Sequence, residues 1–351
     1  MIVKNEAPII ERCLQTVRPW VDHWIIVDTG STDGTQAKVL GAMEVIPGSL
    51  HERPWQDFAH NRNEALELAR PHADYVLFID ADEQLQVPAG FEWPALDGDG
   101  YLFRCLLDGW SYCRNSLVST RLDWCWEGVI HEYLTCPQPH QWQELQGMEI
   151  LVSRDGARAR DPSTYRKDIE VLQSALKREP AHTRYSFYLA QSYRDAGMLE
   201  ESVKQYQRRI ELGGWDEECW YSAFQAAALR ERLKEPQEQV LQAYLGAYAM
   251  RPSRAEPLCK LARYLRMRGE NALAHLYASR AARIRQPADL LFVDASVYTW
   301  RALDELAASA WHVGEIQEGR DAINRLLAEQ RFPESQRRRM QANHRFYFSL
   351  A

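Results

Sequence analysis

Several features are missing from the 351 residues, and each absence excludes a class of protein. No apolar run approaches the length of a membrane span and no signal peptide precedes the first expected strand, so we expect a soluble, cytoplasmic protein. The net charge is −7, whereas a broad nucleic-acid-binding surface needs an excess of positive charge. The seven cysteines include no Cys-x-x-Cys pair and no zinc-like spacing, so we expect reduced thiols.

The length favours two domains, and the hydrophobic pattern changes its period between two parts of the chain. Residues 1–155 alternate short apolar runs with amphipathic segments, which favours a parallel sheet with crossover helices. We expect strands at residues 2–3, 25–27, 43–46, 75–79 and 117–122, and helices at residues 9–17, 36–40 and 57–70. In such sheets ligands bind beyond the carboxyl ends of the strands, where Asp28 and Asp80 stand.

Residues 163–351 are instead helical in pattern, rich in alanine and leucine, and repetitive. Small, aromatic and glycine positions in residues 189–206 match a tetratricopeptide pattern, which returns from residue 261 and from residue 306. We expect a divergent unit at residues 220–252 and an insertion at residues 289–299. Because such repeats mainly bury their faces against one another, we look for the chemistry in the first part of the chain.

The stretch FIDADEQ, residues 78–84, ends an expected strand with three acids, Asp80, Asp82 and Glu83. Near a strand, residues two apart point to the same side, so Asp80 and Asp82 can converge. One interpretation is a solvated turn. The other is a site for a hard divalent cation, which takes carboxylate oxygens and leaves room for phosphates.

Arg62 falls on the same face of its expected helix as Phe58 and Leu66, so its side chain is aimed at the sheet. A buried arginine is costly unless it is paired. We expect its partner to be Asp28, Asp80 or a phosphate, since the planar guanidinium binds such groups in a bidentate manner. A purely structural ion pair is the alternative.

Four motifs in this order resemble glycosyltransferase family 2 with the GT-A fold: MIVKNEAPIIERCL, IIVDTGSTDGT, FAHNRNEALELA and YVLFIDADE. The later WCWEGVIHEYL resembles the His-Glu segment of a subset that includes lipopolysaccharide-core glucosyltransferases. Fusion to tetratricopeptide repeats is similar to the bacterial bacteriocin and protein glycosyltransferases of that family. The resemblance implies an α/β, Rossmann-like GT-A domain with a mostly parallel sheet at residues 1–155, followed by an all-α tetratricopeptide domain at residues 163–351.

The resemblance also implies contacts to a UDP-sugar donor. Asp28 would accept a hydrogen bond from uracil N3–H, and capping of the loop at residues 31–35 is its alternative role. Val3 and Asn5 would contact the base and the ribose, although Asn5 could equally be a helix cap. Asp80 would hold the ribose or the water around a metal ion, while Arg62 would bind the phosphates.

The same resemblance implies a metal site and a base. Asp82 would bind Mn²⁺ or Mg²⁺, which neutralises charge on departing UDP. His131 would complete the coordination, which mildly favours manganese, and Glu132 would be the general base. Glu83 is expected to lie behind the ligands or in solvent. Three tryptophans have two interpretations, a wall that stacks on a sugar or plain packing: Trp110, Trp124 and Trp126.

We therefore expect an inverting, metal-dependent glycosyltransferase that moves a sugar from UDP to a protein, peptide or glycan acceptor. The helical repeats would bind the acceptor or a partner, and the sequence leaves the oligomeric state open, a homodimer included. One alternative is a nucleotidyltransferase of the same fold, but it would want a glycine- and lysine-rich loop near the N-terminus, and none is there. Another is a non-catalytic repeat scaffold with a degenerate transferase domain.

Overall fold

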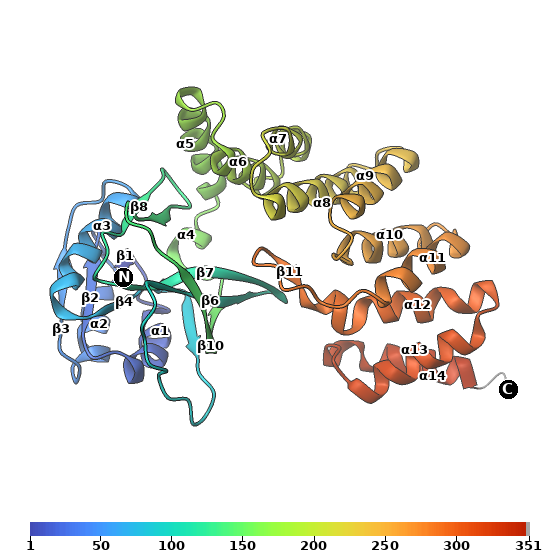
Figure 1. Cartoon of the computed structure of the whole chain (residues 1–351), viewed down its shortest axis with the longest axis horizontal. Helices are drawn as coiled ribbons and strands as arrows, with labels where there is room; N and C mark the ends of the chain where they lie inside the picture. Colours follow the sequence, from blue (N-terminus) through green and yellow to red (C-terminus); the bar gives the residue numbers. More distant parts are fainter. Residues whose placement is uncertain (349–351) are drawn as a thin grey trace. The chain divides into compact units, whose positions relative to one another are not determined.

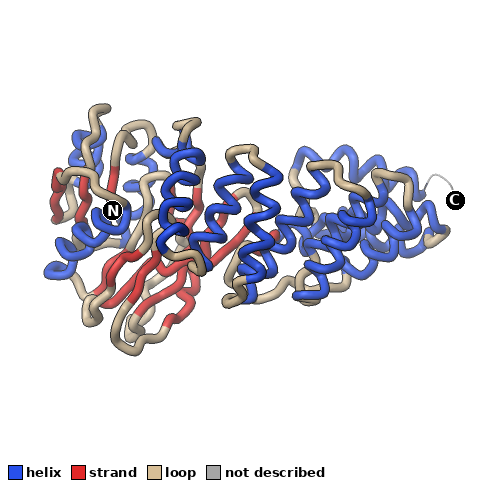
Figure 2. The backbone as a smooth tube through the Cα atoms, turned by 90° about the horizontal axis from the view of Figure 1, so that it is seen from above, coloured by secondary structure: helices blue, strands red, loops and turns tan. Residues whose placement is uncertain are grey.

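The computed structural model describes residues 1–348, whose backbone forms two compact units (Figure 1). Unit 1 comprises Met1–Asp108 and Tyr112–Ser192, and unit 2 comprises Gly109–Ser111 and the described residues from Tyr193 onward. Strands concentrate in unit 1 and helices in unit 2 (Figure 2). All seven cysteines are free thiols. Among residues 1–348, no helix is both long enough and apolar enough to cross a lipid bilayer.

A three-stranded parallel sheet opens unit 1. Its strands, in spatial order, are β1 (Ile2–Val3), β2 (Trp24–Asp28) and β3 (Gly48–Glu52). The helices that follow β1 and β2 are α1 (Ile10–Val17), which the 3-10 turn Arg18–Trp20 extends, and α2 (Thr35–Met43). The buried side chains of α1 recur every three or four residues, at Ile10, Cys13, Leu14 and Val17. This spacing places them on one helical face, which explains why the apolar pattern predicted the helix.

The predicted strand at residues 43–46 is wrong. Met43 is the last residue of α2 and is only 1% exposed, because it packs with Val39 in the core between α2 and the sheet. The strand begins instead at Gly48. A Cβ atom at Gly48 would lie 2.3 Å from the carbonyl oxygen of Trp24, so the close approach of β3 to β2 requires a glycine there.

A second, mixed sheet completes unit 1. Within unit 1 its path is β7-β6-β10-β5, with β4 paired to β7. The strands are β4 (Tyr75–Leu77), β5 (Glu83–Gln86), β6 (Gly100–Leu107), β7 (Trp110–Ser119) and β10 (Trp142–Val152). β10 is parallel to β6 and antiparallel to β5, while β4 is antiparallel to β7. The strand expected at residues 117–122 is therefore the end of the longer β7, and the strand expected at 75–79 ends at Leu77.

Two further elements bring distant parts of unit 1 together. Helix α3 (Phe58–Ala69), followed by the 3-10 turn Arg70–His72, leads into β4, and a separate hairpin pairs β8 (Cys125–Glu127) with β9 (Tyr133–Thr135). A shared apolar core joins α3, the end of β4, β7 and β8 through Leu66, Phe78, Val118, Trp124 and Trp126. This packing sets the connection between β8 and β9 beside α3.

Three helices follow the second sheet: α4 (Ala157–Arg160), α5 (Thr164–Arg178) and α6 (Thr183–Asp195). Unit 1 takes in α4, α5 and α6 as far as Ser192, so the compact unit extends beyond residue 155, where the sequence pattern changes.

Unit 2 is a succession of helical hairpins. Its helices are α7 (Leu199–Glu211), α8 (Asp216–Arg232), α9 (Gln237–Met250), α10 (Glu256–Arg266), α11 (Asn271–Ala282), α12 (Ala302–Ala310), α13 (Ile316–Glu329) and α14 (Arg337–Phe348). Shorter turns lie at Trp311–Val313 and Glu334–Gln336. Buried small residues such as Ala262, Ala278 and Ala307 let neighbouring helices approach closely. This confirms the predicted fold class, an α/β unit with a parallel sheet followed by helical repeats.

The insertion expected at residues 289–299 holds the short strand β11 (Val293–Asp294) and a π-helical turn, Val297–Arg301. Arg254 fixes this segment, because its fully buried guanidinium donates to the carboxylates of Glu256 and Asp289 and to the carbonyl oxygens of Leu291 and Phe292.

Candidate active site

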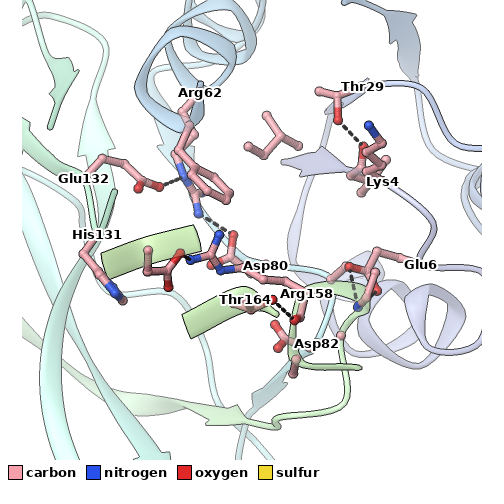
Figure 3. A pocket seen from close by; sticks show the side chains of 18 of the residues that line it. Lys4, Glu6, Thr29, Arg62, Asp80, Asp82, His131, Glu132, Arg158 and Thr164 are labelled. Atoms are coloured by element: carbon pink, nitrogen blue, oxygen red, sulfur yellow. Dashed lines mark hydrogen bonds and ion pairs between the residues drawn. The ribbon is translucent and has the colours of Figure 1, made fainter. Parts of the chain in front are cut away.

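A cavity of about 790 Å³ opens in unit 1, and Figure 3 shows part of its lining. The volume lies in the range of small-molecule sites, which is about 300–1,000 Å³. Its walls come from the end of β1, the start of α3, the residues after β4, the β8–β9 connection, and α4 to α6. All but one of the site residues predicted from the sequence line this cavity: Val3, Asn5, Arg62, Asp80, Asp82, His131 and Glu132. The exception is Asp28.

Asp28 lies directly behind the cavity wall, since it is the strand partner of Val3. It is fully buried, and its Oδ1 accepts hydrogen bonds from the backbone N–H groups of Gly30 and Ser31, both at 2.8 Å. Its Oδ2 is buried without a hydrogen-bond partner. Asp28 therefore does cap the loop, and it also keeps one carboxylate oxygen unsatisfied. An unsatisfied buried acceptor is costly, which marks this oxygen as a point where a ligand donor would be favourable.

Asn5 is not a helix cap, because α1 begins after Ile9. Asn5 adopts a left-handed backbone conformation, with φ of 57°, and ties β1 to the loop that follows β2. Its side-chain oxygen accepts from the N–H of Thr32 at 2.8 Å, and its own N–H donates to the hydroxyl of Ser31 at 2.8 Å. These contacts fix the edge of the cavity where Val3 and Asn5 stand.

Arg62 joins two acids that are far apart in sequence. Its Nη2 donates to Oδ1 of Asp80 at 2.8 Å, and its Nε donates to Oε1 of Glu132 (Figure 3). The guanidinium also lies over the ring of Trp126, 5.0 Å from the ring centroid. The predicted partner Asp80 is confirmed by this geometry, Asp28 is not a partner, and the link to Glu132 was not predicted.

Glu83 supports Asp80 from behind and is not solvated, since it is only 2% exposed. Its carboxylate accepts hydrogen bonds from both terminal nitrogens of Arg114, at 2.6 and 2.7 Å, and from the backbone N–H of Asp80 at 2.9 Å. Burial acts against the charge of Asp80, but Arg62 and Arg114 together hold its pKa below the usual value. Asp80 is therefore an ionised carboxylate held between two arginines.

Asp82 has a different environment. Burial raises its pKa to about 7, and the neighbouring charges of Asp80 and Glu83 add to the shift. No arginine or lysine among the described residues is paired with it. The backbone at Gly156, directly before α4, approaches it so closely that a Cβ there would lie 3.2 Å from Oδ2. A carboxylate that is crowded by other acids and lacks a cation is a fitting ligand for a divalent metal ion.

A preformed metal cage is absent from residues 1–348, because no three or more His, Cys, Asp or Glu side chains stand close enough to hold an ion. The metal that the fold implies fits Asp82 only if other oxygens complete its coordination. Magnesium sites that use one or two carboxylates together with substrate phosphates have this character.

His131 lies in the β8–β9 connection and has a left-handed backbone conformation, with φ of 51°. Its ring stacks on Tyr188 of α6, with 3.9 Å between centroids and 9° between planes. Although the residue is open to the cavity, desolvation by the surrounding protein lowers its pKa, and Arg158 and Arg184 add to this effect. The imidazole is thus neutral, as a metal ligand must be, and its role as a ligand stays a prediction.

Residues 1–88 match the family model described as Glycosyl transferase family 2. They form a glycosyltransferase family 2 domain. Over 92 residues the chain is 41% identical to a TPR repeat-containing protein of Synechococcus elongatus. The matched segment covers 26% of this chain and 22% of that protein. Over 87 residues it is 38% identical to an uncharacterized glycosyltransferase of Rickettsia bellii. This segment covers 24% of this chain and 27% of that protein. The chain therefore spans about a quarter of the length of these relatives.

Solved structures resemble the helical part in fold alone. The crystal structure of MamA matches with a TM-score of 0.39 and 15% identity, covering 48% of this chain and 90% of that one. A tetratricopeptide repeat protein from Parabacteroides merdae matches with a TM-score of 0.40 and 17% identity, covering 53% of this chain and 68% of that one. No conclusion about function follows from these likenesses.

The three tryptophans have different places relative to the cavity. Trp126 lines it, whereas Trp124 is 2% exposed and packs against Trp142. Trp110 belongs to unit 2, where its ring contacts Tyr221 and Phe224. Of the two interpretations, plain packing holds for Trp110 and Trp124, and of the three tryptophans only Trp126 is available to a ligand of this cavity.

Sequence reasoning missed several lining residues. Arg114 stands on β7, where nothing in the local pattern sets it apart, although a buried acid such as Glu83 requires a cation somewhere in the fold. Side chains from α4 to α6 also line the cavity, among them Arg158, Asp168, Arg184 and Tyr188. Their helical period assigned them to the repeats, and no sequence signal marked them as part of a site.

Replacing Arg114 by methionine should lower the free energy of unfolding by about 3–5 kcal/mol, because it leaves the buried Glu83 carboxylate without its cation. The matched control is Arg104→Met, which breaks a solvent-exposed pair with Glu144 and should cost less than about 1 kcal/mol. Urea unfolding of the wild type and the two variants measures both losses of unfolding free energy. Equal costs for the two variants would contradict the structural role of Arg114.

In the metal-free protein, Asp82→Asn should increase stability at neutral pH. The folded-state pKa of Asp82 is raised from 3.8 to about 7, so the unfolded chain ionises first and stability falls as pH rises between these values. In EDTA the melting temperature of the variant should therefore exceed that of the wild type at pH 8 and equal it at pH 3.5. A wild type as stable as the variant at pH 8 would show that Asp82 is not strained by its neighbours.

Proposed function

We propose that the chain is an inverting, metal-dependent glycosyltransferase that moves a sugar from a UDP-sugar to a protein, peptide or glycan acceptor. The observation that carries the proposal is the convergence of Asp80, Asp82 and Glu132 on one cavity of a glycosyltransferase family 2 domain. Asp82, which has no cation beside it, suits a metal ion. Glu132, at the opposite wall, suits the general base that a single displacement needs.

The donor would bind at the strand ends. The unsatisfied Oδ2 of Asp28 would accept uracil N3–H, a hydrogen bond to a charged acceptor. Val3 and Asn5, which line the same edge, would contact the base and the ribose. Asp80 would hold the ribose or a metal-bound water through Oδ2, which Arg62 does not use and which lies 3.7 Å from Nη1 of Arg114. Arg62 would bind the phosphates through Nη1, which neither Asp80 nor Glu132 uses.

Asp82 would hold Mn²⁺ or Mg²⁺ against the diphosphate, with His131 as a further, neutral ligand. The bound metal supplies charge neutralisation for the departing UDP. A bond would form between the acceptor atom and the anomeric carbon as the bond from that carbon to the phosphate oxygen breaks, which inverts the configuration. Glu132 would take the acceptor proton, and Arg62 holds its carboxylate in place for this task.

The helical repeats of unit 2 favour a polypeptide acceptor, because stacked helical hairpins form extended surfaces that bind peptides. A glycan acceptor is the alternative within the same reaction.

A nucleotide thermal-shift panel tests the donor assignment. With Mn²⁺ present, UDP should raise the melting temperature more than GDP or CDP, since binding to the folded state stabilises it by mass action. The matched variant is Asp28→Asn, which keeps an oxygen for the N–H groups of Gly30 and Ser31 but offers the ligand an amide donor. Asp28→Asn should fold and lose the preference for UDP. A UDP shift that survives in this variant, or no UDP shift in the wild type, would contradict the proposal.

A further inference from the structure

Six basic side chains line the cavity, and they differ in whether a carboxylate neutralises them: Lys4, Arg62, Arg114, Arg158, Lys167 and Arg184. Four of them are paired with acids. Arg62 and Arg114 bind the acids described above, Arg158 binds Asp168, and Lys167 binds Asp161. Within residues 1–348, Lys4 and Arg184 form no ion pair. Lys4 follows β1, at the edge expected to face the donor, so Arg184 is the one uncompensated charge on the other wall.

Arg184 is held in a fixed orientation although it lacks an acid. Its Nε donates to the backbone carbonyl of His131 at 2.9 Å. Its guanidinium carbon lies 5.1 Å from the ring centroid of Tyr133 and 4.9 Å from that of Tyr188. Tyr188 in turn stacks on the His131 ring. In the part of the chain that the structure describes, no hydrogen-bond partner is found for the two terminal nitrogens of Arg184.

This arrangement presents a preorganised binding edge. Two aromatic rings lie close to the guanidinium and its Nε donates to the protein, so the terminal N–H groups remain for a ligand. A planar guanidinium edge matches a carboxylate in a bidentate manner, and an arginine that is already oriented loses little freedom on binding. A phosphate dianion would gain less here, because a single uncompensated cation neutralises only part of its charge.

The place of Arg184 assigns this edge to the acceptor. Its contacts are with the β8–β9 connection and with α6, and its main-chain bond is to the residue immediately before Glu132. The metal-binding acid Asp82 and the donor edge at Val3 and Asn5 form no contact with it. A group bound by Arg184 therefore stands beside the segment that carries the base.

We propose that Arg184 binds a carboxylate of the acceptor, and that the acceptor is a polypeptide with an acidic residue next to the modified one. This rests on the proposed function, because it assigns an acceptor to the same site. The polypeptide is favoured because Arg184 stands on α6, the helix whose later residues begin the repeat pattern of unit 2.

The test measures binding of two matched peptides to the protein loaded with UDP and Mn²⁺. The probes are N-acetyl-Gly-Ser-Glu-Gly-amide and N-acetyl-Gly-Ser-Gln-Gly-amide, which differ only in the carboxylate. Calorimetry on the wild type should show the glutamate peptide binding about tenfold more tightly, the value of one hydrogen-bonded charge pair. Arg184→Gln should remove this preference. Arg184→Lys, which keeps the charge without the planar edge, should retain only part of it.

Two controls test whether the preference belongs to Arg184 itself. Lys4→Gln removes the other uncompensated charge and should keep the tenfold preference. The affinity of Arg184→Gln for UDP with Mn²⁺ should match that of the wild type, which also shows that the variant folds.

Three outcomes would overturn the inference. Equal binding of the two peptides to the wild type, with UDP bound normally, would reject the acceptor carboxylate and leave the proposed function intact. Loss of UDP affinity in Arg184→Gln would place Arg184 in the donor site. An Arg184-dependent preference for glucuronate over glucose, without one between the peptides, would show that the acceptor is an acidic glycan. A wild type that binds no UDP would instead reject the proposed function itself.

Discussion

Replacing Glu132 by glutamine should slow sugar transfer by about 10²–10⁴-fold, the usual contribution of a positioned general base. Glutamine keeps the shape and the hydrogen-bonding oxygen but cannot take a proton at neutral pH. Arg62 keeps Asp80 as a charged partner in the variant, so the cavity wall should stay in place. The effect should therefore fall on kcat, with the affinity for UDP and Mn²⁺ nearly unchanged.

Glu127→Gln is the matched control, because Glu127 lies on the neighbouring strand β8 and its exposed carboxylate accepts only from the Thr135 hydroxyl among the described residues. It should transfer sugar at the wild-type rate. Full activity of Glu132→Gln on a hydroxyl acceptor would reject Glu132 as the base. With a cysteine thiol as acceptor the effect should shrink, since a thiol is partly ionised near neutral pH.

Replacing Asp82 by alanine should abolish the stimulation of UDP binding by metal. Asp80 cannot take its place as a ligand, because Arg62 and Arg114 already compete for its charge. Calorimetry with UDP should give the same affinity for the variant in Mn²⁺ and in EDTA, while the wild type should bind much more tightly in Mn²⁺. Asp74→Asn, which changes an exposed acid before the opposite end of β4, is the control and should behave as the wild type.

A variant at Asp82 that keeps the full metal response would show that the metal is bound elsewhere. The same comparison on Asp82→Asn, which is expected to stabilise the metal-free protein at neutral pH, separates loss of the metal response from unfolding.

The sequence predicted the parts of the site that depend on local periodicity. Asp28 and Asp80 end apolar runs, so their place at the carboxyl ends of strands follows from the alternation of strands and helices. The helical spacing of Arg62 with Phe58 and Leu66 aimed it at the sheet, and its bond to Asp80 agrees with that. Local pattern is informative here because the apolar face of each element must be buried.

Long-range pairing could not be predicted. Arg62 and Glu132 are 70 residues apart, and only the packing of α3 against β8 brings them together. Arg114 was missed for the same reason, since its partner Glu83 lies on another strand. The strand expected at residues 43–46 failed because Met43 and Val39 are apolar at a spacing of four, which a helix satisfies better than a strand.

The contribution of α4 to α6 to the cavity was hidden by their helical pattern. Arg184 and Tyr188 have the period of a repeat helix, and their contacts with Tyr133 and His131 appear only when the fold brings the β8–β9 connection beside α6. Asn5 illustrates a local version of this limit: its residue type suits a helix cap, but the loop after β2 competes for its side chain and binds it.

Release of UDP from UDP-sugars tests the central claim most directly. The wild-type chain should release UDP from at least one UDP-sugar in Mn²⁺ and release none in EDTA. It should cleave the corresponding GDP-sugars far more slowly. The Asp82→Ala and Glu132→Gln variants, which fail for different reasons, should both be defective under the same conditions. Absence of UDP release from every common UDP-sugar by folded, UDP-binding protein, with or without candidate acceptors, would contradict a transferase function and favour a non-catalytic repeat scaffold.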